Sequence, residues 1–252
     1  WDSVLLPWST TKKEIITTSW LNTKKNLPIL LCVSMIYLMI MVLLFQIFTL
    51  MSPQFTDNMQ TDGIGGLLSL PLPSIQNLFF ILASALFITG LNLGFLQICI
   101  NIFQNNTFSI IQLFNSFDVL FPYILTSILY GIIQCVAAAP GLMLLLIFMN
   151  FNLSGIFSSI GIVLAFLPAV YFSIRLQFYV YFLLDQNQGC IESLKESFII
   201  SKGYVYQLFI IGAILSIIVQ LSIIPFFIGL IIAVPFSKMV TTYTYIKLQK
   251  IN

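Results

Sequence analysis

Arg175 is the residue whose type and position in this sequence could do the most chemistry. It is the only arginine of the chain and lies inside a long apolar run, where a charged side chain usually has a function or a partner. Two interpretations stay open. The guanidinium could reach the phosphate of lipid headgroups at the membrane surface, or it could bind an anionic headgroup or substrate in a vestibule open to the cytoplasm. Lys238, three positions beyond Pro235, could join it in a basic patch.

Tyrosines could complete this patch. Tyr179 follows Arg175 by one helical turn, which would place both on one helix face. Tyr181, Tyr243 and Tyr245 could line the same patch, and the alternative is an ordinary aromatic belt at the membrane surface. The predicted ligand-binding or lipid-binding residues are Arg175, Lys238, Tyr179 and Tyr243.

Catalysis has less support than binding. The sequence contains no His, which removes the commonest proton shuttle and the commonest metal ligand. Its eight acidic residues lie at or outside the ends of the apolar runs, and no zinc or serine-hydrolase motif occurs within those runs. We therefore expect no catalytic residue, no metal site and no cofactor. A lipid-modifying membrane enzyme is the least supported alternative.

The composition is that of an integral membrane protein. Hydrophobic residues make up 59% of the chain and charged residues 7%, whereas about a quarter of residues are charged in soluble proteins. The formal net charge is only +2 and the basic residues are scattered, so nucleic acid is not an expected partner. We expect one polytopic membrane domain over residues 1–252.

Six apolar stretches reach the roughly 20 residues that a membrane-spanning helix needs. These spans cover residues 29–51, 75–101, 119–149, 155–184, 204–224 and 226–247. The predicted fold is therefore all-α, with three helical hairpins. Basic residues, which are retained on the cytoplasmic side, precede the first span, separate the fourth from the fifth and follow the sixth. Both termini are predicted to be cytoplasmic.

An amphipathic segment precedes each hairpin, at residues 10–23, 107–117 and 189–201. In the third, helical geometry places a group of apolar side chains on one face and a group of polar side chains on the other. The apolar group is Ile191, Leu194, Phe198 and Ile199, and the polar group is Glu192, Ser193, Glu196 and Ser197. Helices of this kind lie in the headgroup layer, so we expect three cytoplasmic interfacial helices.

Glycine and proline predict breaks in these helices. The positions are Gly90, Pro140, Gly141, Pro168, Gly203 and Pro235. Three of them, Gly90, Pro168 and Pro235, fall within the second, fourth and sixth spans, so three repeated hairpins could surround a pseudo-threefold axis. The alternative is that Gly and Pro are simply frequent in membrane helices. Gln134 and Asn92 lie inside spans, where interhelical hydrogen bonds compete with ion binding as their role.

Four segments carry a resemblance to a known family: Ala139-Pro140-Gly141, LPAVYFSIRLQFYVYFLLD ending at Asp185, ESLKESFIISKGYVYQLF from Glu192 to Phe209, and IGLIIAVPFSKMVTTYTY from Ile228 to Tyr245. Together they resemble the YciC-like group of uncharacterised bacterial inner-membrane proteins, which is related to the membrane domain attached to some glycerophosphodiester phosphodiesterases. Ala169 departs from the pattern, since relatives often carry Gly there. The resemblance implies a six-helix bundle in a bacterial inner membrane and no established activity.

The functional expectation follows from the amphipathic segments and the nearly apolar spans. We expect a non-enzymatic, multi-pass protein of the bacterial inner membrane that binds lipid or a partner membrane protein and serves envelope maintenance or membrane assembly. The expected partners are membrane lipids and a membrane protein or a second copy of the chain. The alternative is a transporter or exporter component, with a cytoplasmic vestibule for an anion or lipid at broken helices.

Overall fold

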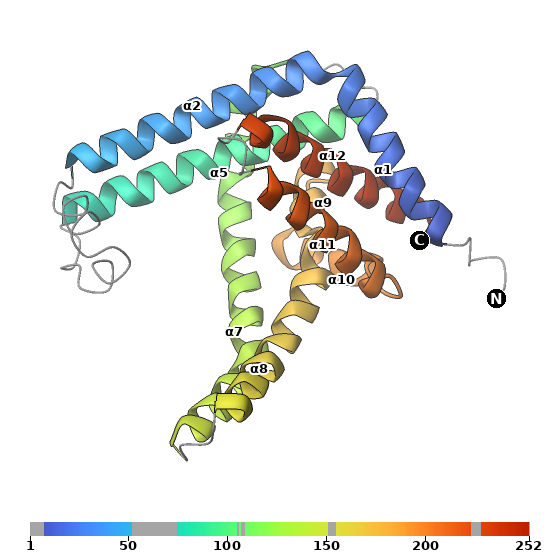
Figure 1. Ribbon diagram of the computed structural model, residues 1–252. Helices are drawn as coiled ribbons and strands as arrows, with labels where there is room; N and C mark the ends of the chain where they lie inside the picture. The colour runs from blue at the N-terminus through green and yellow to red at the C-terminus, as the bar shows by residue number, and fades with distance from the viewer. Residues whose placement is uncertain are drawn as a thin grey trace. The chain divides into compact units, whose positions relative to one another are not determined.

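The computed structural model describes residues 8–51, 75–104, 106, 109–150, 155–222 and 228–251. These residues form helices and connecting turns, with no strand among them (Figure 1). The helices are α1 (Trp8–Lys25), α2 (Leu27–Met51), α5 (Ile75–Gln104), α6 (Gln112–Asn115), the 3-10 helix η1 (Ser116–Val119), α7 (Leu120–Asn150), α8 (Gly155–Leu176), α9 (Tyr179–Asp185), α10 (Cys190–Ile200), α11 (Val205–Leu221) and α12 (Ile228–Ile251). The predicted helix boundaries at 107–108 and at 223–227 lie outside the described residues.

Several helices are long and apolar enough to cross a membrane. Among the described residues these stretches are Leu27–Leu50, Ile75–Gln104, Gln112–Leu144 and Phe166–Asp185. A fifth is added if α10 and α11, which meet at 99°, form one bent span. The chain is thus an all-helical protein with several potential membrane spans, as predicted. The sixth predicted span is not among them; its helix α12 carries Lys238, Lys247 and Lys250.

The chain divides into two compact units, Lys25–Leu120 and the combination of Trp1–Lys24 with Phe121–Asn252. We call the first the hairpin unit and the second the core unit. In the hairpin unit, α2 and α5 run side by side (Figure 1). The single membrane domain expected over residues 1–252 stays a prediction.

Two glycines on α5 hold the next segment of the hairpin unit against that helix. A Cβ added at Gly90 would lie 2.6 Å from the ring of Phe117, and one added at Gly94 would overlap the backbone carbonyl of Leu113. This G-x-x-x-G spacing lets two backbones approach closely. The predicted break at Gly90 is wrong, because α5 is continuous from Ile75 to Gln104 and the glycine serves packing instead.

Helices occur at all three predicted amphipathic segments, but the second is short. Helix α1 covers the first and α10 the third, while the second contains only the four residues of α6 followed by η1. Leu113 of α6 is fully buried, beside Gly94 of α5. The second segment therefore packs against α5 through α6.

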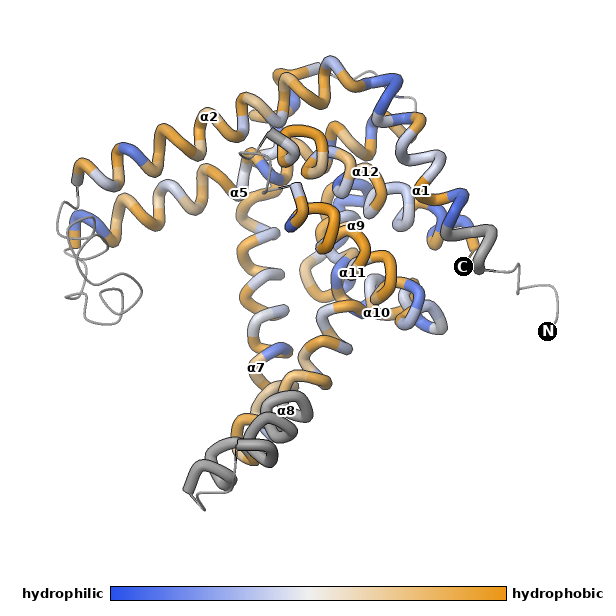
Figure 2. Tube along the Cα trace, viewed as in Figure 1, coloured by the Kyte–Doolittle hydropathy of each residue, from blue (hydrophilic) through white to orange (hydrophobic). Residues whose placement is uncertain are grey.

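In the core unit, α1 packs against α11 and α12. Ile15 of α1 is buried in one cluster with four residues of α11 and α12: Ile211, Leu215, Phe236 and Val240. Trp20 of α1 meets Phe236 edge-on at 5.6 Å. Figure 2 shows that α1 is much less hydrophobic than α11, so α1 joins the unit through a few apolar residues.

Three predicted proline breaks are not interruptions of their helices. Pro140 lies inside α7 with Gly141, Pro168 inside α8 and Pro235 inside α12, and each helix continues through them. A proline removes only one backbone N–H, and membrane helices tolerate that loss. Gly203 lies in the turn between α10 and α11, and its φ of 84° lies in the left-handed region that favours glycine.

Candidate functional site

The chain is interrupted between α8 and α9, at residues 177–178. Side chains of α10 form hydrogen bonds with the backbone at this interruption. The carbonyl of Arg175 accepts from the hydroxyls of Ser197 at 3.1 Å and Ser201 at 3.0 Å. The N–H of Phe178 donates to the Ser197 hydroxyl at 3.0 Å. A helix end leaves backbone groups without intrahelical partners. Two serines therefore replace the bonds lost at this interruption.

These serines belong to a stripe on α10 that faces the protein. Ser193, Ser197 and Ser201 recur every fourth residue and are all fully buried. The amphipathic prediction placed Ser193 and Ser197 on the polar face that points away from the apolar one, and it is wrong to expect this face outside the protein, because both serines are fully buried. Small side chains allow close helix contact. The hydroxyls of Ser197 and Ser201 form hydrogen bonds with backbone groups that lack an intrahelical partner at the interruption. The S-x-x-x-S-x-x-x-S spacing was the sequence signal for this stripe.

Arg175 lies inside the core unit, where it joins α8 to α10. The residue is 6% exposed, and its Nη2 donates to the Phe198 carbonyl at 2.6 Å while Nη1 donates to the Tyr171 hydroxyl at 3.1 Å. The guanidinium carbon lies 3.7 Å from the centre of the Phe198 ring, a cation–π contact. A cation is also favourable beside carbonyls at a helix C-terminus. Arg175 is thus engaged within the protein, and its binding role stays a prediction.

Polar side chains of α7 form a seam with α8 and α9. They recur on one helix face at spacings of four, three and four residues: Tyr123, Ser127, Tyr130 and Gln134. The hydroxyls of Tyr130 and Ser173 are hydrogen-bonded at 2.8 Å. Those of Ser127 and Tyr179 are hydrogen-bonded at 3.1 Å. A cavity of about 410 Å³ adjoins the seam and is lined by Tyr130, Ser173, Ile174, Gln177 and Tyr179.

Gln134 is the last polar residue of the seam along α7, and its side chain bonds to the backbone of α8. With its amide nitrogen facing α8, it donates to the Ala169 carbonyl at 2.9 Å and accepts from the Ser173 N–H at 3.1 Å and from the Tyr130 hydroxyl at 3.2 Å. This arrangement supports the interhelical hydrogen-bonding role predicted for Gln134. The amide joins α7 directly to the backbone of α8.

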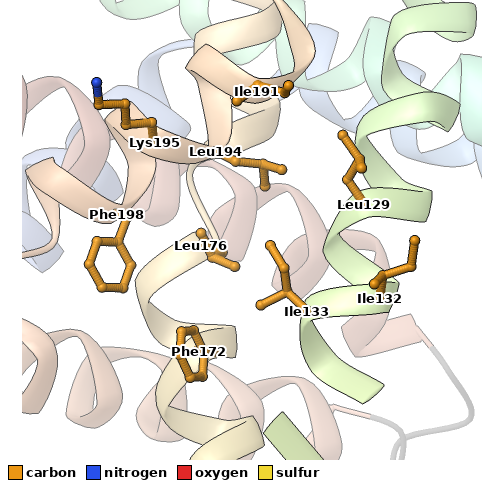
Figure 3. Close-up of a pocket in the computed structure, with 9 residues that line it drawn as sticks. All are labelled: Leu129, Ile132, Ile133, Phe172, Leu176, Ile191, Leu194, Lys195 and Phe198. Atoms are coloured by element: carbon orange, nitrogen blue, oxygen red, sulfur yellow. The ribbon is translucent and has the colours of Figure 1, made fainter. Parts of the chain in front are cut away.

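A separate, apolar groove of about 490 Å³ lies between α7, α8 and α10. Figure 3 shows the side chains that line it: Leu129, Ile132, Ile133, Phe172, Leu176, Ile191, Leu194, Lys195 and Phe198. Of these described residues, Lys195 alone carries charge, and its amine points away from the other eight (Figure 3). The amphipathic pattern had marked Ile191, Leu194 and Phe198 as an apolar face, and this face now forms one wall of the groove.

The other predicted binding residues have different surroundings from Arg175. The Tyr179 ring stacks with Tyr123 and Tyr130 of α7. Tyr243 packs against the cluster formed by α1, α11 and α12. Lys238 is half-buried on α12. Arg175, Tyr179 and Tyr243 therefore pack against α10, α7 and the α1–α11–α12 cluster respectively, and the proposed common patch stays a prediction.

Tyr181 and Tyr245 link α9 to α12. Their rings stack with centroids 5.0 Å apart, and the hydroxyl of Tyr181 donates to Thr241 at 2.8 Å. Tyr245 is fully buried, and its hydroxyl donates to the Asp185 carboxylate at 3.1 Å. These two tyrosines have interior contacts that an aromatic belt at the membrane surface would not require.

Within the described ranges, no group of three or more His, Cys, Asp or Glu residues is placed to hold a metal ion. Comparison with protein-family models, with curated proteins and with solved structures gave no match. The resemblance to the YciC-like group therefore stays a prediction, and the function is argued from the geometry of the chain alone.

Proposed function

We propose that this is a non-enzymatic, multi-pass membrane protein that binds lipid in the groove between α7, α8 and α10. The observation that supports this most strongly is the groove itself, about 490 Å³ in volume and lined almost entirely by hydrocarbon side chains. Two of its walls belong to helices long enough to cross a membrane. An apolar surface of this kind would meet acyl chains rather than water. The proposed setting is the bacterial inner membrane, with a role in envelope maintenance or membrane assembly.

A cross-linking experiment tests the groove. The purified chain is reconstituted with a phospholipid that carries a photoreactive acyl chain, and the adducts are mapped by mass spectrometry. Ile132→Trp fills the groove, while Ile217→Trp adds the same bulk on α11. The two isoleucines are matched in exposure, at 54% and 56%. We expect adducts on groove residues that Ile132→Trp reduces several-fold and Ile217→Trp leaves unchanged. Equal labelling of both variants would refute lipid binding in the groove.

The proposal includes six spans with α12 as the sixth, both termini in the cytoplasm and three hairpins in a repeated arrangement. An even number of spans places the two ends of the chain on the same side of the membrane, and five spans would separate them. Single cysteines at Lys13 and Lys250, in a variant that lacks the four native cysteines, report the side by labelling with an impermeant maleimide. Labelling of the two positions from opposite sides would rule out six spans.

A transporter or exporter component is the second candidate, because the interruption between α8 and α9 adjoins a polar seam and a cavity of about 410 Å³. Interrupted helices with polar groups near them are common at transporter binding sites. The test is uptake of a panel of small organic anions by proteoliposomes. Gln177→Leu removes a polar side chain from the cavity wall and should abolish any flux. Uptake no faster than in protein-free vesicles would refute this candidate.

A further inference from the structure

We propose that the groove selects anionic phospholipids, with one acyl chain in the groove and the phosphate of the headgroup held by the amine of Lys195. This inference rests on the proposed lipid-binding function and deepens it by naming the class of lipid. It assigns the headgroup to a lysine that the sequence patterns did not single out, instead of to Arg175.

The direction of the groove suits an extended chain. Leu129 and Ile133 are four residues apart on α7, and Leu176 and Phe172 are four residues apart on α8, so each wall runs for about 6 Å along its helix. Figure 3 shows Phe172 at the end of the groove opposite Ile191 and Lys195. A hydrocarbon chain that enters beside α10 can therefore continue along α7 and α8.

The size of the groove favours a slender occupant. One turn of an α-helix of about 10 Å diameter and 5.4 Å pitch fills roughly 420 Å³. The groove, at about 490 Å³, would hold little more than one such turn. A helix of a partner or of a second copy would place little more than one turn in the groove, whereas a hydrocarbon chain is narrow enough to lie between its walls.

Charge complementarity selects the headgroup. Lys195 is exposed and forms no ion pair among the described residues. The neighbouring carboxylates of α10 do not line the groove, and that of Glu192 is turned towards Gly189 at the start of the helix, 3.5 Å from where a Cβ would stand there. Arg175, which lies over the Phe198 ring, is already bonded to a carbonyl. Lys195 is therefore the cation available to a phosphate.

The positions of charge and hydrocarbon match the layers of a membrane. Within its eleven residues α10 carries Glu192, Lys195 and Glu196, whereas the groove residues of α7 and α8 are all apolar. Charged amphipathic helices lie at the level of lipid headgroups. A lipid with its phosphate at Lys195 would thus have its acyl chain at hydrocarbon depth. A net-negative headgroup is favoured because a zwitterionic one brings its own cation towards the lysine amine.

Native mass spectrometry of the full chain tests the inference, with equal amounts of dioleoyl phosphatidylglycerol and dioleoyl phosphatidylcholine as competing probes. The two lipids have the same chains and differ in net charge. We expect a preference of roughly fivefold for phosphatidylglycerol, the size of effect typical of one basic residue beside anionic lipid. Lys195→Gln should abolish the preference and Lys195→Arg should retain it. Lys202→Gln removes another exposed lysine outside the groove and should leave the preference unchanged.

The outcomes separate this inference from the proposed function. If both lipids bind equally to the native chain and Ile132→Trp removes both, the groove binds lipid but the headgroup inference fails. If Lys202→Gln lowers the preference as much as Lys195→Gln does, general surface charge is responsible and the inference also fails. If Ile132→Trp leaves both lipids bound, lipid binding in the groove fails as well. Because Lys195 is exposed, its variants are expected to fold, and circular dichroism is the measurement that checks this.

Discussion

Replacing Ser197 by Ala should weaken the contact between α10 and the interruption of α8 and α9. The hydroxyl of Ser197 both accepts from the N–H of Phe178 and donates to the carbonyl of Arg175. Phe178 is only 2% exposed, so its N–H would be left buried without a partner. The Arg175 carbonyl would keep the hydroxyl of Ser201.

The magnitude follows from this asymmetry. A buried donor without a partner costs about 1 to 3 kcal/mol, so we expect Ser197→Ala to lower the free energy of unfolding by about 2 kcal/mol. Ser201→Ala leaves the Phe178 N–H bonded and should cost at most about 1 kcal/mol. The double variant also deprives the Arg175 carbonyl of both hydroxyls, so its cost should exceed the sum of the single costs.

The assay is reversible unfolding in mixed micelles with increasing sodium dodecyl sulfate, followed by circular dichroism. Ser216→Ala is the matched control, because that hydroxyl is exposed and bonds to a carbonyl of its own helix, so its change should stay within about 0.5 kcal/mol. The reasoning is refuted if Ser197→Ala costs no more than Ser216→Ala, or if Ser201→Ala costs more than Ser197→Ala.

Three further substitutions test other contacts by the same unfolding assay. Gly94→Ala should destabilise the chain by about 2 to 3 kcal/mol, because its Cβ would overlap the backbone of α6, whereas Gly131→Ala, which meets open space, should be neutral or slightly stabilising; equal effects would contradict the close approach. Gln134→Leu should cost about 1 kcal/mol by removing the hydrogen bonds between α7 and α8, and an unchanged unfolding midpoint would argue against that link. Tyr245→Phe should cost about 1 to 2 kcal/mol through loss of the hydrogen bond to Asp185; if it costs nothing, the hydroxyl makes no net contribution.

Hydropathy was a sound guide to the helices that could cross a membrane, because length and apolarity are properties of a single segment. Residues 29–51 and 75–101 correspond closely to α2 and α5. The turn at Gly203 was also predictable, since a positive φ favours glycine. Pro168 shows where local rules fail: the helix passes through it, and the chain is interrupted instead beyond Leu176, at residues that are neither Gly nor Pro.

The candidate site was predictable only in part. Arg175 was recognised as unusual, but its partner Phe198 lies 23 residues away on another helix, and no local pattern specifies that contact. Ser193 and Ser197 were assigned to the outer face because polar residues usually face water. In this chain they face a helix interruption whose backbone groups need partners, while apolar residues such as Ile191 face outwards. The spacing of the serines was visible in the sequence, and its meaning depended on the fold.

The packing of α1 has a consequence for the order of events during synthesis. Ile15 is made about 200 residues before its neighbours Ile211 and Phe236. At about 5 to 20 residues per second, the delay is roughly 10 to 45 seconds. The ion pair between Glu14 and Lys247 must wait longer still. Throughout this interval α1 lacks the residues of α11 and α12 against which it packs, so it is made long before it can reach its final place.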